Sequence, residues 1–203
     1  MQKGLLFVVS GPSGAGKGTI CKGLVEKLDI DLSVSMTTRM PRPFETEGKS
    51  YYFVSKERFN EILKKGGFLE HACVYGNFYG TPKDLVMQSL DKGRDVVLEI
   101  DIQGAMQIRE SYPKAIFIFI LPPSMSELRK RITGRGSETE DAINIRLGET
   151  LKEVSYIDKY DYCVVNGELS EALDRVAAII KAEHSRVSEN IFRLIENYKE
   201  EIK

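Results

Sequence analysis

The sequence has no tryptophan, few cysteines and no long apolar run. Its three cysteines, Cys21, Cys73 and Cys163, are widely spaced and form no C-x-x-C pair, which argues against a disulfide framework and against a zinc site. No stretch approaches the ~20 apolar residues that a transmembrane helix needs, and the apolar run near the N-terminus is too short for a secretory signal. We therefore expect a cytoplasmic protein that is neither exported nor membrane-spanning.

The chain also lacks an excess of positive charge. Its 203 residues include 29 Lys and Arg against 30 Asp and Glu, a formal net charge of -1. Non-specific binding to a nucleic-acid backbone depends on a basic excess, so nucleic acid is not an expected partner. The arginines gather instead in two places, Arg39 with Arg42 and the segment from Arg129 to Arg146, where a local excess of positive charge suits a small polyanion.

Short runs rich in β-branched and aromatic residues are apolar throughout instead of alternating with polar residues. There are four of them: Leu5–Val9, Val96–Ile100, Ala115–Leu121 and Tyr162–Val165. Such strands are covered on both faces, as in parallel sheets, and helical apolar patterns lie between them. The alternation predicts an α/β fold built on a doubly wound parallel sheet.

Two inserts interrupt this core, which we assign to residues 1–33, 82–123 and 156–203. The first insert, residues 34–81, contains Pro and Gly breakers and several tyrosines, and we expect a small α+β lobe. The second, residues 124–155, contains a capping box, Ser137-x-x-Glu140, ahead of an apolar stripe, and we expect a helical lid.

Beyond Glu168 the apolar spacing predicts helix to the end of the chain. A single helix over residues 171–201 would be about 45 Å long, longer than a small core is wide. Its end either packs against a neighbouring subunit, forming a homodimer, or folds back along its own core.

A glycine-rich loop directly follows the first predicted strand and precedes a helical stripe. Its residues are Gly11, Pro12, Ser13, Gly14, Ala15, Gly16, Lys17, Gly18 and Thr19. Backbone N–H groups of such a loop bind phosphate, with Lys17 on the β- and γ-phosphates. The alternative is a glycine-rich turn with a solvated lysine. Because Gly18 separates Lys17 from Thr19, either direct or water-mediated contact of Thr19 with Mg²⁺ is compatible with the pattern.

The loop alone does not define the reaction, because ATPases, GTPases and kinases share it. The Asn-Lys-x-Asp segment by which GTPases read guanine does not occur in this chain. From about residue 4 to residue 183 the sequence instead resembles the guanylate kinases, through an ordered set of motifs. They are SGPSGAGKGT, Ser35-Met-Thr-Thr-Arg39-x-Pro-Arg42, Gly48-Lys-x-Tyr51-x-Phe53, Gly76-Asn-x-Tyr79-Gly, Leu98-Glu-Ile-Asp101-Ile-Gln-Gly104 and Gly134-Arg-Gly136.

The resemblance implies a GMP site in the first insert. The residues that match the family's phosphate-binding positions are Arg39, Arg42, Tyr51 and Tyr79, and those that match its guanine-binding positions are Glu70, Asp101, Ser35 and Thr81. Guanidinium groups suit a phosphate dianion, and carboxylates suit the N1–H and N2–H₂ donors of guanine.

Each of these positions also has an ordinary structural interpretation. Arg39 and Arg42 would be solvated loop charges, and the two tyrosines core aromatics. Glu70 would be a surface acid. Thr81 would be a helix N-cap, because Pro82 and an acid in the first turn follow it.

Glu99 and Asp101 lie two residues apart at the end of a predicted buried strand, so both should face the crevice beyond the carboxyl edge of the sheet. We expect Glu99, with Thr19, to hold Mg²⁺ or its bound water; otherwise the two acids merely end a strand. The resemblance also implies that Arg135 and Arg146 of the lid reach the transferred phosphoryl group, against the alternative of a basic solvated helix face.

Together the resemblance implies an enzyme that transfers the γ-phosphate of ATP to GMP, and to dGMP, with Mg²⁺. The charge-neutralising side chains would be Lys17, Arg39, Arg42, Arg135 and Arg146. Two rival interpretations are a protein-binding module that keeps the fold without catalysis, and a monophosphate kinase for another base.

Overall fold

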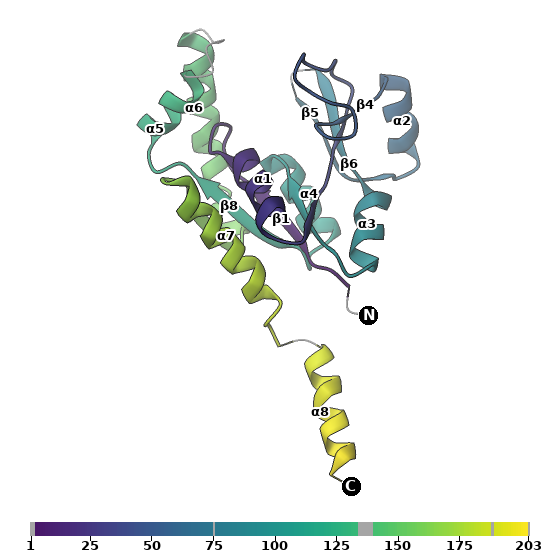
Figure 1. Ribbon diagram of the computed structural model, residues 1–203. Coiled ribbons are helices and arrows are strands. Elements are labelled where there is room, and N and C mark those ends of the chain that lie inside the picture. The colour runs from purple at the N-terminus through teal and green to yellow at the C-terminus, as the bar shows by residue number, and fades with distance from the viewer. Residues whose placement is uncertain (1–2, 75, 134–139, 188, 203) are drawn as a thin grey trace.

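The computed structural model describes residues 3–74, 76–133, 140–187 and 189–202. Figure 1 shows a central sheet flanked by helices, a small lobe beside α3, a helical pair formed by α5 and α6, and α8 projecting from the body. Within the described ranges no helix is both long and apolar enough to cross a membrane.

The central sheet has five strands in the order β2-β7-β1-β8-β9, and all its pairings are parallel. These strands are β1 (Leu6–Ser10), β2 (Ile30–Leu32), β7 (Asp95–Glu99), β8 (Ile116–Leu121) and β9 (Tyr162–Val165). The four predicted strands and the parallel α/β fold are confirmed, with strand ends shifted by at most one residue. The sequence did not predict β2, because three residues with a central aspartate give no apolar run.

Helices cover both faces of this sheet. On one face α1 (Lys17–Lys27) and α7 (Leu169–Glu183) pack on alternate strand residues, such as Phe7 and Val9. On the other face α3 (Lys83–Asp91) and α4 (Ile102–Ser111) pack on Leu6 and Val8. Because every residue of β1 is buried, an uninterrupted apolar run is what this position requires.

A second, mixed sheet forms the small lobe, with strand order β4-β3-β6-β5. Its elements are β3 (Met36–Thr37), β4 (Tyr52–Phe53), α2 (Lys56–Lys64), β5 (Phe68–Val74) and β6 (Asn77–Pro82). The lobe has its own aromatic centre, because the ring of Phe59 stacks at 4.5 Å on Phe68 and at 5.6 Å on Phe78.

The second insert contains α5 (Met125–Thr133) and α6 (Glu140–Val154), followed by the short helix η1 (Ile157–Lys159). Leu147 of α6 packs on Leu128 and Ile132 of α5, so the two helices share a small apolar contact. The predicted capping box cannot be compared, because Ser137 lies outside the described residues.

The prediction of one continuous C-terminal helix is wrong. Helix α7 ends at Glu183, and α8 (Glu189–Glu201) begins after a turn. The end of α7 is fastened to the core, because the His184 ring lies 2.6 Å from Asp95 and the buried Glu183 accepts a hydrogen bond from Tyr162. The backbone N–H of Ser185 then bonds to Ala182, three residues back, which tightens the last turn.

Candidate active site

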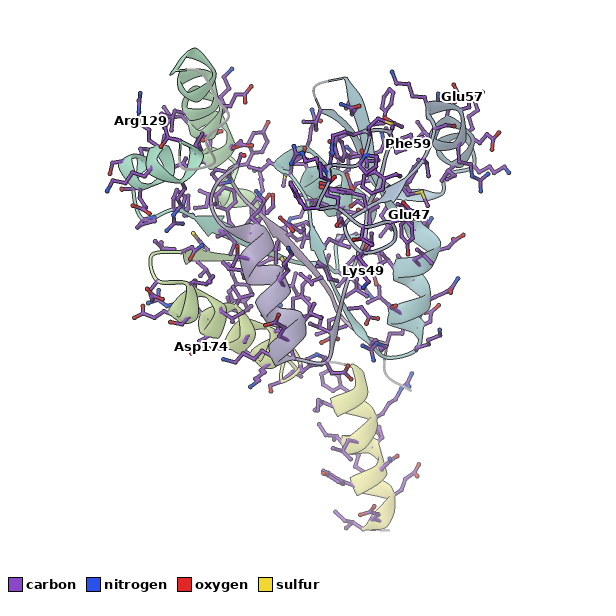
Figure 2. All side chains as sticks on the ribbon, turned by 45° about the horizontal axis from the view of Figure 1, so that its top comes forward. Glu47, Lys49, Glu57, Phe59, Arg129 and Asp174 are labelled. Atoms are coloured by element: carbon purple, nitrogen blue, oxygen red, sulfur yellow. The ribbon has the colours of Figure 1, made fainter. Side chains whose placement is uncertain are left out.

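A cavity of about 550 Å³ lies between the phosphate loop, the end of β7 and the small lobe. Its lining includes many of the predicted site residues: Gly11, Ser13, Lys17, Ser35, Tyr51, Glu70, Tyr79, Glu99 and Asp101. Figure 2 shows the labelled Arg129 on α5 and the labelled Phe59 in the small lobe, on opposite sides of the molecule. The fold thus brings residues far apart in the sequence, from Gly11 to Glu153, to one space, with the two inserts on either side.

The phosphate loop connects β1 to α1. Replacing its glycines with any other residue would strain the backbone. Gly16 has φ 94° and caps α1, and a Cβ there would lie 2.3 Å from the Asn166 amide nitrogen. A Cβ at Gly11, with φ 140°, would lie 2.2 Å from the Ile120 carbonyl oxygen. The loop is therefore pressed against the neighbouring strand ends.

Lys17 starts α1 with its ammonium group turned back onto the loop. Its Nζ donates to the carbonyl oxygens of Gly11 at 2.6 Å and Pro12 at 3.1 Å. Burial lowers the pKa of Lys17 from its ordinary value, and the nearby Glu99 carboxylate acts in the opposite direction. The lysine is thus part of the loop and not the solvated side chain of the alternative interpretation.

Asn166 supports the loop from behind, and the sequence analysis did not identify it. Its side-chain amide donates to the Ala15 carbonyl at 2.8 Å, and its backbone carbonyl accepts from Arg131 of α5 at 3.1 Å. Arg131 also pairs with Glu127 at 3.1 Å. The available sequence signal was an asparagine directly after a predicted parallel strand, since side chains at that edge point toward ligand sites.

Glu70 is a buried carboxylate that lines the cavity. It is 5% exposed, so the interpretation as a surface acid is wrong. Burial raises the pKa of Glu70 to about 7, although a hydrogen bond of 2.6 Å from the Thr81 hydroxyl acts against that rise. Gly104 allows this position, because a Cβ there would lie 2.5 Å from a Glu70 carboxylate oxygen.

Thr81 does not cap a helix. It lies in β6, fully buried, and its hydroxyl serves Glu70, while Pro82 holds the cap position of α3 without a side-chain hydrogen bond. Pro82 belongs to β6 and the helix starts one residue later, at Lys83. The sequence correctly predicted that a helix starts here. The position of Glu70 in the fold decided which group Thr81 binds.

Asp101 does cap a helix while it lines the cavity. Its carboxylate accepts from the Gly104 backbone N–H at 2.8 Å at the start of α4. This fixes the side chain beside Glu70 at the carboxyl edge of the sheet. Both Glu99 and Asp101 line the same cavity, as their spacing predicted.

Arg39, Tyr51 and Tyr79 form one cluster in the lobe. The Arg39 Nε donates to the Tyr79 hydroxyl at 3.2 Å, and its guanidinium carbon lies 5.5 Å from the centre of the Tyr51 ring. Arg39 also pairs with Glu45 at 2.7 Å. Because of these contacts, Arg39 is not a solvated loop charge.

The remaining predicted residues lie at the margin or outside the described part. Arg42 is exposed, and its backbone N–H donates to Glu45 at 2.8 Å. Arg135 lies outside the described residues, and Arg146 belongs to α6 without a described side chain. Their roles stay predictions.

Oxygen ligands suited to Mg²⁺ lie beside the phosphate loop. Thr19 is exposed in the first turn of α1, and a Glu99 carboxylate oxygen lies 3.0 Å from the point where a Cβ on the neighbouring Gly18 would be. A hydroxyl and a carboxylate are hard oxygen donors, so this donor set fits Mg²⁺.

A lysine-bearing phosphate loop here shares one cavity with Glu70, a buried carboxylate that the Thr81 hydroxyl orients. That arrangement defines the class of P-loop nucleoside monophosphate kinases. The family model described as "Guanylate kinase" matches residues 3–183. The chain belongs to the guanylate kinase family.

Curated relatives and a solved structure agree with this assignment. The chain is 56% identical to guanylate kinase of Clostridium tetani over 187 residues, covering 92% of this chain and 90% of that one. It is 52% identical to guanylate kinase of Clostridioides difficile over 203 residues, covering 100% and 99%. The crystal structure of guanylate kinase from Anaplasma phagocytophilum superimposes with a TM-score of 0.77 at 38% identity, covering 92% of this chain and 89% of that one.

Proposed function

We propose that this site transfers the γ-phosphate of ATP to GMP, giving ADP and GDP, and that it also accepts dGMP. The observation that carries the proposal is the juxtaposition of Lys17 and Glu70 in one cavity. The phosphate loop binds the donor, and the lobe binds the acceptor. Family membership and the near full-length curated relatives support this reaction.

The base is recognised at the buried end of the cavity. The ionised Glu70 and Asp101 carboxylates accept hydrogen bonds from the N1–H and N2–H₂ groups of guanine. The Ser35 hydroxyl lines the same cavity, and the buried Thr81 hydroxyl orients the Glu70 carboxylate by donating to it at 2.6 Å. Adenine presents an acceptor where guanine presents N1–H, so it leaves a buried carboxylate unpaired.

The acceptor phosphate is bound by Tyr51 and Tyr79, which line the cavity, and by Arg39, which donates to the Tyr79 hydroxyl. Arg42 supplies a further guanidinium. A phosphate oxygen is already ionised at neutral pH, so the reaction needs no general base. Catalysis consists of holding two polyanions in line and neutralising their charge. Lys17, with Arg135 and Arg146 of the lid, contributes the positive charge at the transferred group.

We also propose that Mg²⁺ accompanies ATP, with the Thr19 hydroxyl and the Glu99 carboxylate holding it directly or through water. When bound, the ion neutralises charge on the phosphate oxygens. The protein's own contribution is to orient the donor through the loop N–H groups and Lys17.

Initial rates with GMP, dGMP, AMP, CMP and UMP as acceptors test the assignment. We expect a preference for GMP over AMP of about 10³-fold or more, the range available when a polar site is left unpaired by the wrong base. Comparable rates with AMP would contradict the guanine site. No phosphorylation of any monophosphate would instead favour a protein-binding module.

We further propose a cytoplasmic homodimer formed through α8. The helix presents apolar side chains to solvent, each 40–60% exposed: Ile191, Phe192, Leu194, Ile195 and Tyr198. Three of them, Ile191, Leu194 and Tyr198, recur at spacings of three and four residues and share one face of the helix. Such a face favours a second copy of the chain.

Truncation after Val187 is expected to convert the dimer into a monomer while GMP kinase activity stays within about threefold. This cut removes α8 and keeps the contact between His184 and Asp95. Sizing by light scattering, together with the kinase assay, measures both outcomes. Leu194→Glu should have the same effect and Arg193→Glu should not; a monomer before truncation would contradict the proposal.

A further inference from the structure

Helix α4 packs beside β5, the edge strand of the small lobe that contains Glu70. Asp101, the N-cap of α4, is followed at spacings of three by Gly104 and Gln107, so the three residues lie along one face of the helix. Asp101 lines the cavity, and Gly104 leaves room for the Glu70 carboxylate. Gln107 binds the strand itself.

The Gln107 side-chain amide makes two hydrogen bonds to the backbone of one β5 residue. Its Nε2 donates to the His71 carbonyl oxygen at 2.7 Å, and its Oε1 accepts from the His71 backbone N–H at 3.1 Å. The outer edge of a sheet presents N–H and C=O groups that no further strand pairs, and here a glutamine amide pairs with both. Gln107 thus ties the small lobe to a helix of the core.

This contact lies next to Glu70, at an irregular point of the sheet. The register of β5 on β6 shifts between Phe68 and His71, which marks a bulge, and Glu70 lies within it. Because a bulge interrupts the regular ladder, pairing with β6 alone does not fix the direction of the Glu70 side chain. The Gln107 amide holds the residue that follows the bulge.

We infer that Gln107 is a positioning residue for guanine recognition, because it holds the His71 backbone and thereby fixes the neighbouring Glu70 in the cavity. The inference rests on the proposed guanine site. Among the described residues, those that line the cavity do not include Gln107, so its effect on GMP is expected to pass through Glu70. Helix α4 then carries one guanine acceptor, Asp101, and holds the strand that carries the other.

Steady-state kinetics of the full chain with Gln107→Met test the inference. Methionine keeps the length of the side chain and removes both hydrogen bonds. We expect KM for GMP to rise about 5- to 20-fold, while KM for ATP and kcat stay within about threefold of the wild type. Gln88→Met is the matched control, because it makes the same replacement at an exposed position on α3, and it should leave all three constants unchanged.

A double-mutant cycle with Glu70→Gln shows whether Gln107 acts through Glu70. In the Glu70→Gln background the carboxylate to be positioned is gone, so adding Gln107→Met should raise KM for GMP by less than about twofold. The same fold-increase in both backgrounds would overturn the inference.

A purely structural role for Gln107 gives a different result. If the amide only stabilises the fold, Gln107→Met lowers the melting temperature and leaves KM for GMP unchanged, which would also overturn the inference. Should Gln107→Met not fold, Gln107→Asn replaces it in the test: its amide is one methylene shorter, and KM for GMP should still rise. A wild-type chain that phosphorylates AMP as fast as GMP would instead refute the guanine site itself, and the inference with it.

Discussion

Replacing Lys17 with methionine is expected to lower kcat by about 10²–10³-fold or more while the fold is kept. The ammonium group is the loop's own positive charge, and its loss removes a preorganised contact from the transition state. Methionine keeps much of the side-chain volume in this partly buried position. Steady-state rates at saturating ATP and GMP measure the effect.

Lys22→Met provides the control, because Lys22 lies on the exposed side of the same helix. It should retain the wild-type rate, and circular dichroism should show both variants folded. A Lys17→Met enzyme within threefold of the wild type would contradict the assigned role.

Replacing Glu70 with glutamine is expected to raise KM for GMP and to lower kcat/KM by about 10- to 100-fold. The amide either presents a donor to the N1–H and N2–H₂ donors of guanine or leaves one of them with a weaker acceptor, inside a buried pocket. Kinetics at pH 8, where the Glu70 carboxyl with a pKa of about 7 is mostly ionised, measure the difference. Glu61→Gln, at an exposed position on α2, should leave the kinetics unchanged.

The stability of the free protein gives a second measurement on Glu70. Below pH 4.5 the carboxyl is protonated in both the folded and unfolded chains, and between pH 4.5 and about 7 only the unfolded chain ionises. Glu70 therefore lowers the free energy of unfolding as pH rises through this range, by on the order of 3 kcal/mol. Urea denaturation at pH 5 and pH 8 should show a smaller difference for Glu70→Gln than for the wild type. An equal difference would contradict the raised pKa.

Much of the fold could be predicted because the central strands of its main sheet are buried on both faces. Such strands must be continuously apolar, so the sequence alone indicates β1, β7 and β8. The edge strand β9 was also predicted from its apolar run, although only Val164 of its four residues is buried. The phosphate loop was equally evident, because its geometry depends on local glycines between a strand and a helix. Features that depend only on neighbouring residues could therefore be predicted from the sequence.

The tertiary structure decided the features that depend on distant neighbours. Thr81 is a strong helix cap by sequence, and it turns to Glu70 only because β5 and β6 pair. By its residue type Glu70 would be expected at the surface. Its burial against Gly104 raises its pKa. The apolar spacing of the C-terminal segment continues past His184, yet α7 ends at Glu183, beside the contact of His184 with Asp95.

The same distinction explains why Asn166 was not identified from the sequence. Asn166 supports Ala15 from 151 residues away. A hydrogen bond between such distant positions leaves no periodicity or spacing in the chain. The sequence by itself determined the sheet, the phosphate loop and the kind of chemistry, because these rest on local geometry and residue type. Only the folded chain decided which acids are buried, which are solvated and which lie against the loop, because burial and charge are set by what packs alongside.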